Sequence, residues 1–273
     1  MKAGSAGSIP AGVTKSQNHS QPLKIFLREV GEAVAHLNTI VVGLDAVEKG
    51  HKKPSTLRIS WNPNDPKLAA IKARRFALES ILVRVCEALN QYVSATSRLP
   101  RINSALRKHK DHPSTAEKLS DLAKAVQIED CFLVAGSCLL IHWRNRAVHL
   151  NSDAKLTPAQ VSSLKSASEE IEKKFASLSV IRLLEDFDRK TPTLKDISTL
   201  IAMTIRLVRK IDGRLGEVSK EDLVALLIHY GLDKKIEKIN REDPLQRQLP
   251  STLQLLRTEA PGLVKAYQEH CSE

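Results

Sequence analysis

The sequence has few aromatic residues and no strand-like alternation of apolar and polar residues. Aromatic side chains make up 4% of the 273 residues, whereas leucine, alanine, isoleucine and valine are abundant within a hydrophobic content of 42%. This balance favours packed helices over a β-sandwich, in which period-two alternation is expected. The hydrophobic content is also high enough to form a real core. The sequence therefore predicts an all-α protein built as a helical bundle.

Cysteines are few and poorly spaced for cross-links or metal binding. The chain has four, at positions 86, 131, 138 and 271, and no CxxC pair. Cys131 and Cys138 are seven residues apart, about two turns along one helical face. Because a disulfide framework or a zinc site needs closer or better-matched spacing, we expect free, buried thiols in a reducing compartment.

No segment has the pattern of a signal peptide or a membrane span. Residues 1–20 are rich in glycine, serine and polar residues, and they lack an apolar h-region, so we expect a flexible tail. The longest apolar run, residues 131–143, is well short of the ~20 residues that a spanning helix needs. We therefore expect a cytoplasmic protein that makes no contact with a membrane.

Positive charge is in excess, with a net charge of +11 and an isoelectric point near 9.5. Such a charge favours a polyanionic partner or an anionic surface, but it does not choose between nucleic acid, membrane and simple solubility. Several basic residues gather in the connector 98–113, namely Arg101, Arg107, Lys108 and Lys110. Two interpretations stay open, a strip that contacts RNA phosphates and a solvated loop, because no aromatic residue interleaves the run to stack on bases.

Apolar spacing and capping residues predict the helices. Apolar residues three and four apart predict long helices over 22–48 and 66–97, separated by a loop rich in proline and asparagine. Further helices are expected from 114, from about 127 through the polar cluster described below, over 158–178, and over 193–211. We divide the chain into a tail (1–20), a helical domain (21–190) and a C-terminal helical extension (191–273).

One predicted helix ends unusually. The stretch from Cys131 to Trp143 is almost wholly apolar, and then Arg144, Asn145, Arg146 and His149 follow within six positions. At ~100° per residue, Asn145 and His149 lie ~40° apart on a straight helix, whereas Arg144 and His149 lie ~140° apart. Arg144 and His149 therefore cannot converge on one small target unless the helix unwinds between them or a second copy of the surface completes the site.

The chemistry of these residue types suggests acid–base work on a phosphate. Histidine exchanges a proton near neutral pH, arginine holds a phosphate through two parallel hydrogen bonds, and an asparagine one turn away can orient the imidazole. No carboxylate cluster accompanies them, so we expect no metal and no other cofactor. The set fits the attack of a ribose 2′-hydroxyl on its own phosphate. Arg146 points away from Asn145 and His149, and we expect it to form an interface ion pair or an RNA contact.

The segment RNRAVH resembles the Arg-x4-His motif of the HEPN superfamily. The resemblance covers about residues 22–190, and it implies an all-α bundle, a homodimer with the motif in a cleft between protomers, and metal-independent endoribonuclease activity in toxin–antitoxin, abortive-infection or antiviral systems. It also implies that Arg144 stabilises the scissile phosphate, that Asn145 positions the phosphate or the imidazole, and that His149 is the acid and base. The partners implied are RNA and an antitoxin or defence-system protein.

Three other interpretations of the motif stay open. Arg144 and His149 are also the residues that satisfy the last carbonyls of an ordinary helix. The chain can also be a HEPN-like module that binds RNA or a partner protein without cleaving, or a helical scaffold with surplus positive charge. One position departs from the family: members paired with a nucleotidyltransferase antitoxin have a modified tyrosine two positions after the histidine, where this chain has Asn151.

Overall fold

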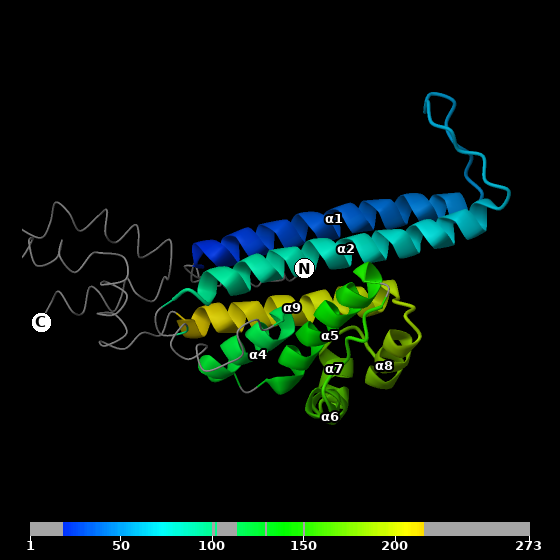
Figure 1. Ribbon diagram of the computed structural model, residues 1–273. Helices are drawn as coiled ribbons and strands as arrows, with labels where there is room; N and C mark the ends of the chain where they lie inside the picture. The colour runs from blue at the N-terminus through cyan, green and yellow to red at the C-terminus, as the bar shows by residue number, and fades with distance from the viewer. Residues whose placement is uncertain (1–18, 100–101, 103–113, 129, 150, 216–273) are drawn as a thin grey trace, which may run out of the picture.

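The computed structural model describes residues 19–99, 102, 114–128, 130–149 and 151–215, and within these residues it contains α-helices and no strand. The all-α prediction is confirmed for this part of the chain (Figure 1). The helices are α1 (Gln21–Glu48), α2 (Pro66–Thr96), α4 (Thr115–Ala125), α5 (Cys131–Val148), α6 (Pro158–Ser166), α7 (Ser168–Lys174), α8 (Val180–Asp188) and α9 (Leu194–Leu215).

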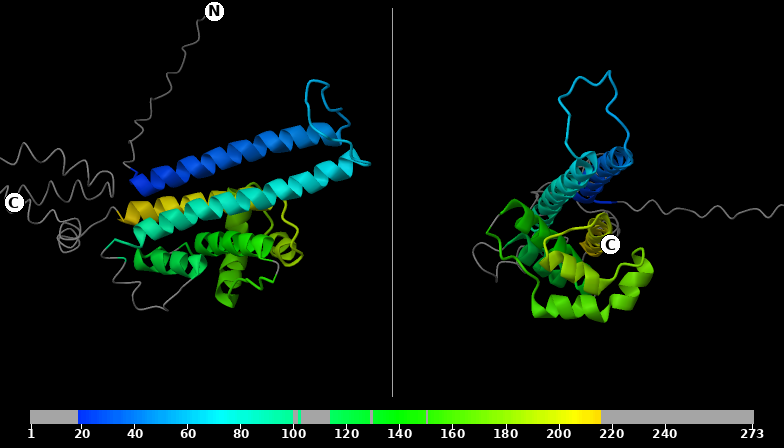
Figure 2. Two further views of the ribbon diagram at one scale, coloured as in Figure 1. Left: turned by 45° about the horizontal axis from the view of Figure 1, so that its top comes forward. Right: turned by 90° about the vertical axis from the view of Figure 1, so that its right-hand side faces the viewer.

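Helices α1 and α2 pair as a long antiparallel hairpin along one side of the molecule. Their connecting loop, residues 49–65, projects from the far end of the hairpin, as both views of Figure 2 show. Trp61 of this loop is only partly covered and is not among the residues that pack on the core, so it does not fold back on the core. The shorter helices and α9 lie on the other side of α2 (Figure 1).

The predicted helix starts are confirmed where a capping residue indicated them in the sequence. Asp65, Ser114 and Thr157 each accept a hydrogen bond from a backbone N–H of the first turn, at the starts of α2, α4 and α6. At the start of α9, the Thr193 hydroxyl accepts from the Asp196 N–H at 3.1 Å. Each bond satisfies a donor that the helix itself leaves without a partner.

Helix α5 lies at the centre of the bundle, where it packs against α2, α4, α6 and α9. Trp143 is 2% exposed, and its ring stands edge-on to that of Phe187 in α8, with the centroids 5.4 Å apart. Gly136 lets α9 approach closely, since a Cβ there would lie 2.5 Å from the Met203 Sδ. The burial that the apolar run predicted is confirmed. Its first residue, Cys131, is an exposed free thiol, whereas Cys86 and Cys138 are buried free thiols.

Two helix predictions are wrong in their limits. Helix α5 begins at Cys131 and not near Gln127, whose φ of 55° is incompatible with a right-handed helix. The segment 158–178 is not one helix: it breaks at Ala167 into α6 and α7, and left-handed residues follow at 176 and 177. The apolar spacing still identified its core-facing residues, because four of its members are buried, namely Leu164, Ile171, Phe175 and Leu178.

Helix α9 belongs to the same core as α5, although the sequence placed a domain boundary after residue 190. Its buried residues include Leu200, Met203 and Leu207, and they join the hydrophobic cluster that contains α5. The 190 boundary therefore separates helices that share one core. The rest of the predicted extension, 216–273, and residues 1–18 of the predicted tail lie outside the described residues.

Little of the apolar surface of α1 is covered by the rest of the molecule. Its buried residues are Leu23, Phe26, Val30 and Leu37, and it packs mainly against α2. In the described part of the chain it is the one helix long and apolar enough to cross a membrane, and 11% of that apolar window is buried. Such a helix decides nothing about a membrane, because helices of soluble proteins have the same length and composition.

Candidate functional site

The polar cluster predicted from the sequence lies at the C-terminal end of α5, where the helix leaves the core. The last helical residue is Val148, and the His149 N–H donates to the Asn145 carbonyl at 2.9 Å. His149 itself has an extended backbone, with φ −112° and ψ 107°, and its carbonyl accepts from the Ser152 N–H at 2.9 Å. The His149 N–H therefore completes the last helical hydrogen bond, and the helix does not unwind between Arg144 and His149.

Arg144 and Asn145 are in direct contact. Both are half-buried, and the Arg144 Nη1 donates to the Asn145 Oδ1 at 3.2 Å. The Asn145 side chain thus holds the guanidinium rather than the imidazole. His149 is exposed, and within the described residues no hydrogen bond joins its side chain to Arg144 or Asn145. The structure therefore brings two of the three predicted catalytic residues into contact and places the third at the exposed end of the helix.

The charge of Arg144 lies beside α2. Burial raises the pKa of the Cys86 thiol to about 12, while the positive charge of Arg144 lowers it and the negative charge of Glu87 raises it further. Cys86 lies at the seam between the two helices, with its Sγ 3.8 Å from the Leu140 carbonyl oxygen. A thiol with this pKa stays protonated at neutral pH and is a poor nucleophile. This effect of Arg144 on Cys86 could not be read from the sequence, because the two residues are 58 positions apart.

Arg146 is bound within the chain. Its Nε donates to the Ala154 carbonyl at 2.7 Å, and its Nη1 donates to the Phe187 carbonyl at 2.9 Å. The guanidinium carbon also lies 3.7 Å from the centroid of the Phe187 ring, in cation–π geometry. These contacts fasten the end of α5 to the following loop and to α8. They favour a structural role for Arg146 over the RNA contact or interface ion pair that we expected from the sequence.

His142 lies one turn before Arg146 and is half-buried. Burial lowers the pKa of His142, and the positive charge of Arg146 lowers it further, so the neutral imidazole is favoured. Its Nδ1 is buried and has no hydrogen-bond partner in the described part of the chain. His142 is therefore not held in the core by a hydrogen bond between its Nδ1 and a backbone carbonyl among the described residues.

The basic connector joins α2 to α4. Arg101, Arg107, Lys108 and Lys110 lie outside the described residues. The connector leaves from the end of α2 and returns at the start of α4, where Thr115 Oγ1 is 3.2 Å from Asn90 Oδ1 of α2. The two interpretations of this connector therefore stay open.

Comparison with models of protein families, with curated proteins and with solved structures finds no match to this chain. The resemblance to the HEPN superfamily therefore depends on the motif and the helical bundle alone.

Proposed function

We propose that this protein is a metal-independent endoribonuclease of a toxin or antiviral defence system. One observation carries the proposal: in an all-α bundle, the central buried helix ends in an Arg144–Asn145 pair, and His149 follows at its exposed end. The packing of the buried part of α5 and the capping of this helix do not require Arg144, Asn145 and His149 in combination. The set agrees with the Arg-x4-His resemblance and with a net charge of +11, which favours a polyanionic substrate.

The proposed reaction needs only the RNA and these side chains. His149 accepts the proton of a ribose 2′-hydroxyl, and the 2′-oxygen attacks the adjacent phosphorus. The bond to the 5′-oxygen of the next nucleotide breaks, and that oxygen takes up a proton. The products are a 2′,3′-cyclic phosphate and a free 5′-hydroxyl. Arg144 binds the non-bridging phosphate oxygens, whose charge grows in the transition state, and Asn145 keeps the guanidinium in place.

The resemblance also supports a homodimer in the cytoplasm and a partner protein that restrains or triggers the activity. RNA contacts by the connector residues belong to the same proposal. Asn151 stands where a modified tyrosine is found in one branch of the family, so we do not propose control by nucleotide transfer to that position.

The alternative is a HEPN-like module that binds RNA or a partner protein without cleaving it. A specific observation favours it: Asn145 is engaged with Arg144, and no hydrogen bond in the described residues orients the His149 ring. A general acid–base needs such positioning once substrate is bound, although catalytic hydrogen bonds often tighten only in the complex.

The test compares wild type, His149→Ala and His51→Ala on total cellular RNA, including tRNA, in the presence of EDTA. His51 is an exposed histidine in the loop after α1, so its change controls for the loss of any surface imidazole. We expect cleavage by wild type and His51→Ala, at least ~100-fold slower cleavage by His149→Ala, and cyclic phosphate ends. Equal cleavage by all three proteins, or cleavage that stops in EDTA, would contradict the mechanism. Salt-sensitive RNA binding without any cleavage would favour the module.

A further inference from the structure

A groove with a volume of about 420 Å³ runs between α1 and α2 in the middle of the hairpin. Its walls are mostly apolar, and two of its large apolar side chains are far from covered: Phe76 is 72% exposed and Ile40 is 47% exposed. Glu32 and His36 of α1 and Arg84 of α2 form its polar edge. No residue of the α5 cluster lines the groove.

We propose that a second copy of this chain binds in this groove, so that two hairpins form a four-helix bundle. A phenylalanine side chain buries 150–250 Å² when it is covered, and uncovered apolar patches on soluble proteins mark contact surfaces. This surface is separate from the motif, so the contact proposed here is distinct from a contact between motifs in the proposed homodimer, and it does not depend on RNA cleavage.

The charges of the two helices identify a second copy as the occupant. Helix α1 has more carboxylates than cationic groups, namely Glu29, Glu32, Asp45 and Glu48 against Lys24 and Arg28. Helix α2 has the opposite balance, namely Lys67, Lys72, Arg74, Arg75 and Arg84 against Glu79 and Glu87. A surface with one acidic and one basic ridge is complementary to itself, which an isologous contact requires.

The charges also select the arrangement of the two copies. A two-fold axis parallel to the hairpin places each α1 on the partner's α2, antiparallel to it, so an acidic helix meets a basic one. A two-fold axis across the hairpin would instead place α1 on α1 and α2 on α2, with like charges opposed.

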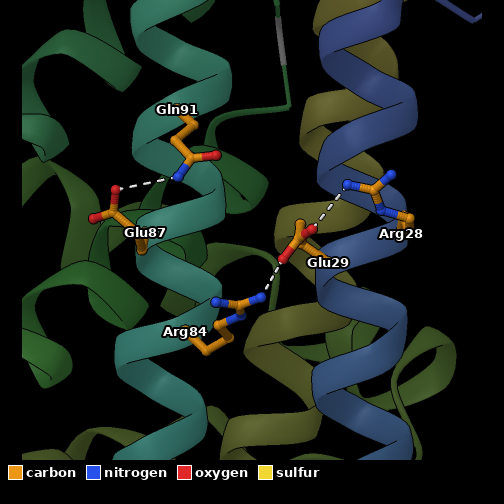
Figure 3. Close-up of polar contacts among 5 residues, drawn as sticks. All are labelled: Arg28, Glu29, Arg84, Glu87 and Gln91. Atoms are coloured by element: carbon orange, nitrogen blue, oxygen red, sulfur yellow. Dashed lines mark hydrogen bonds and ion pairs between the residues drawn. The ribbon is translucent and has the colours of Figure 1, made fainter.

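Ion pairs within the hairpin fix which residues lie at the same level (Figure 3). Glu29 of α1 binds Arg84 of α2 as well as its neighbour Arg28, and the hydrogen bond from Arg28 is the main cause that lowers the pKa of Glu29. Farther along, Glu48 binds Arg74 at 2.9 Å. Between these two pairs, His36 and Ser80 lie at the same level, and both line the groove.

The first experiment measures the mass of the full chain by light scattering over a range of concentrations. We expect wild type to approach twice the mass of Phe76→Glu at the same concentration, a comparison that a contact between motifs does not obscure. Phe76→Glu is expected to weaken dimerisation at least ~30-fold, since a central aromatic residue of an interface contributes that much or more. The matched control is Ile181→Glu on α8, where the isoleucine is 65% exposed but lies outside the hairpin, and this variant should dimerise as wild type does.

The second experiment tests the arrangement and does not depend on a destabilising change. Both preparations carry Cys131→Ser and Cys271→Ser, so that the native thiols that remain are buried. One also carries His36→Cys and the other Ser80→Cys, and the two are mixed and oxidised gently. The proposed arrangement brings these positions together between copies, so the mixture should form a disulfide-linked dimer that neither variant forms alone. Equal masses for wild type and Phe76→Glu, or cross-linking no greater in the mixture than in the separate variants, would each overturn the proposal.

Discussion

Helix α5 and the α1–α2 hairpin are both rich in apolar residues, but the molecule treats them differently. Neighbouring helices cover α5, so Trp143 is 2% exposed. In the hairpin, α2 makes most of the contact with the bundle, and Phe76 and Val42 remain 72% and 71% exposed. Apolar content therefore shows that a segment gains from burial, but not whether its own chain supplies the cover.

The two regions also differ in what their polar groups do. At the end of α5, arginines bind carbonyl groups and an asparagine within the chain. On the hairpin, the charged residues form surface pairs between helices, such as Arg74 with Glu48. Buried, bound groups hold one structure in place, whereas surface pairs add little to stability and more to the choice of partner.

The largest effect that separates the two regions should come from truncating Trp143. We expect Trp143→Ala to lower the free energy of unfolding by about 3–5 kcal/mol, because it leaves a cavity between α5 and α8. The matched change Phe76→Ala should cost less than about 0.5 kcal/mol in dilute solution, where self-association does not contribute. Urea unfolding of both variants measures the difference. A similar cost for both would mean that Phe76 is covered within the single chain.

Removal of Arg146 should give the next largest effect. Arg146→Met keeps the aliphatic stem but loses two hydrogen bonds from a charged group and the contact with the Phe187 ring, so we expect a loss of about 2–3 kcal/mol in stability. Arg98→Met, at an exposed arginine just after α2, is the control and should change stability by less than about 0.5 kcal/mol. If Arg146→Met instead unfolds like wild type and only weakens RNA binding, the sequence interpretation of Arg146 as an RNA contact would be correct.

The sequence was most informative where a local pattern decides the structure. The N-caps of α2, α4 and α6 are Asp65, Ser114 and Thr157. They could be predicted because an N-cap bond joins residues two or three apart in the sequence. It was least informative where distant residues decide. The break at Ala167 lies within a segment of uninterrupted helical spacing, and α9 joins the core of α5 across a predicted domain boundary.

The candidate site shows the same division. The choice of Arg144, Asn145 and His149 came from their residue types and from the resemblance to the Arg-x4-His motif, and angular spacing showed that Arg144 and His149 do not converge on a straight helix. The sequence does not show which partners these side chains have, because the partners depend on rotamers and on α2 and α8. Asn145 accepts from Arg144, Arg146 donates to the Phe187 carbonyl, and the charge of Arg144 acts on Cys86.

A smaller effect is expected where α5 meets α9. Gly136→Ala should destabilise the protein by about 1–2 kcal/mol, because the added Cβ would lie 2.5 Å from the Met203 Sδ and the methionine must move. At Gly43 on the hairpin, a Cβ meets nothing within 4 Å, so Gly43→Ala should stabilise the protein by about 0.5–1 kcal/mol through helix propensity. Thermal unfolding of the two variants gives opposite signs under this expectation. A stabilising Gly136→Ala would show that the methionine adapts without cost.

The smallest effect concerns the place where the hairpin joins the bundle. The Ser20 N–H, at the start of α1, donates to the Asp212 carboxylate of α9 at 3.2 Å, and the Ser20 hydroxyl donates to the same group. Burial raises the pKa of Asp212 above its ordinary 3.8, although these bonds oppose the change. The folded chain therefore holds this proton more tightly than the unfolded chain does. The stability from this linkage is fully present below the unfolded pKa and is lost as the pH rises through the folded pKa.

Asp212→Asn removes this titration. We therefore expect the stability of wild type relative to Asp212→Asn to be greatest below pH 3.8 and to fall as the pH rises through the folded pKa. Urea unfolding midpoints of both proteins at several pH values measure this difference, with Asp153→Asn as a control at an exposed carboxylate. A wild-type advantage that grows with pH would mean that the bonds from Ser20 outweigh burial, and that the ionised carboxylate is what holds the hairpin to the bundle.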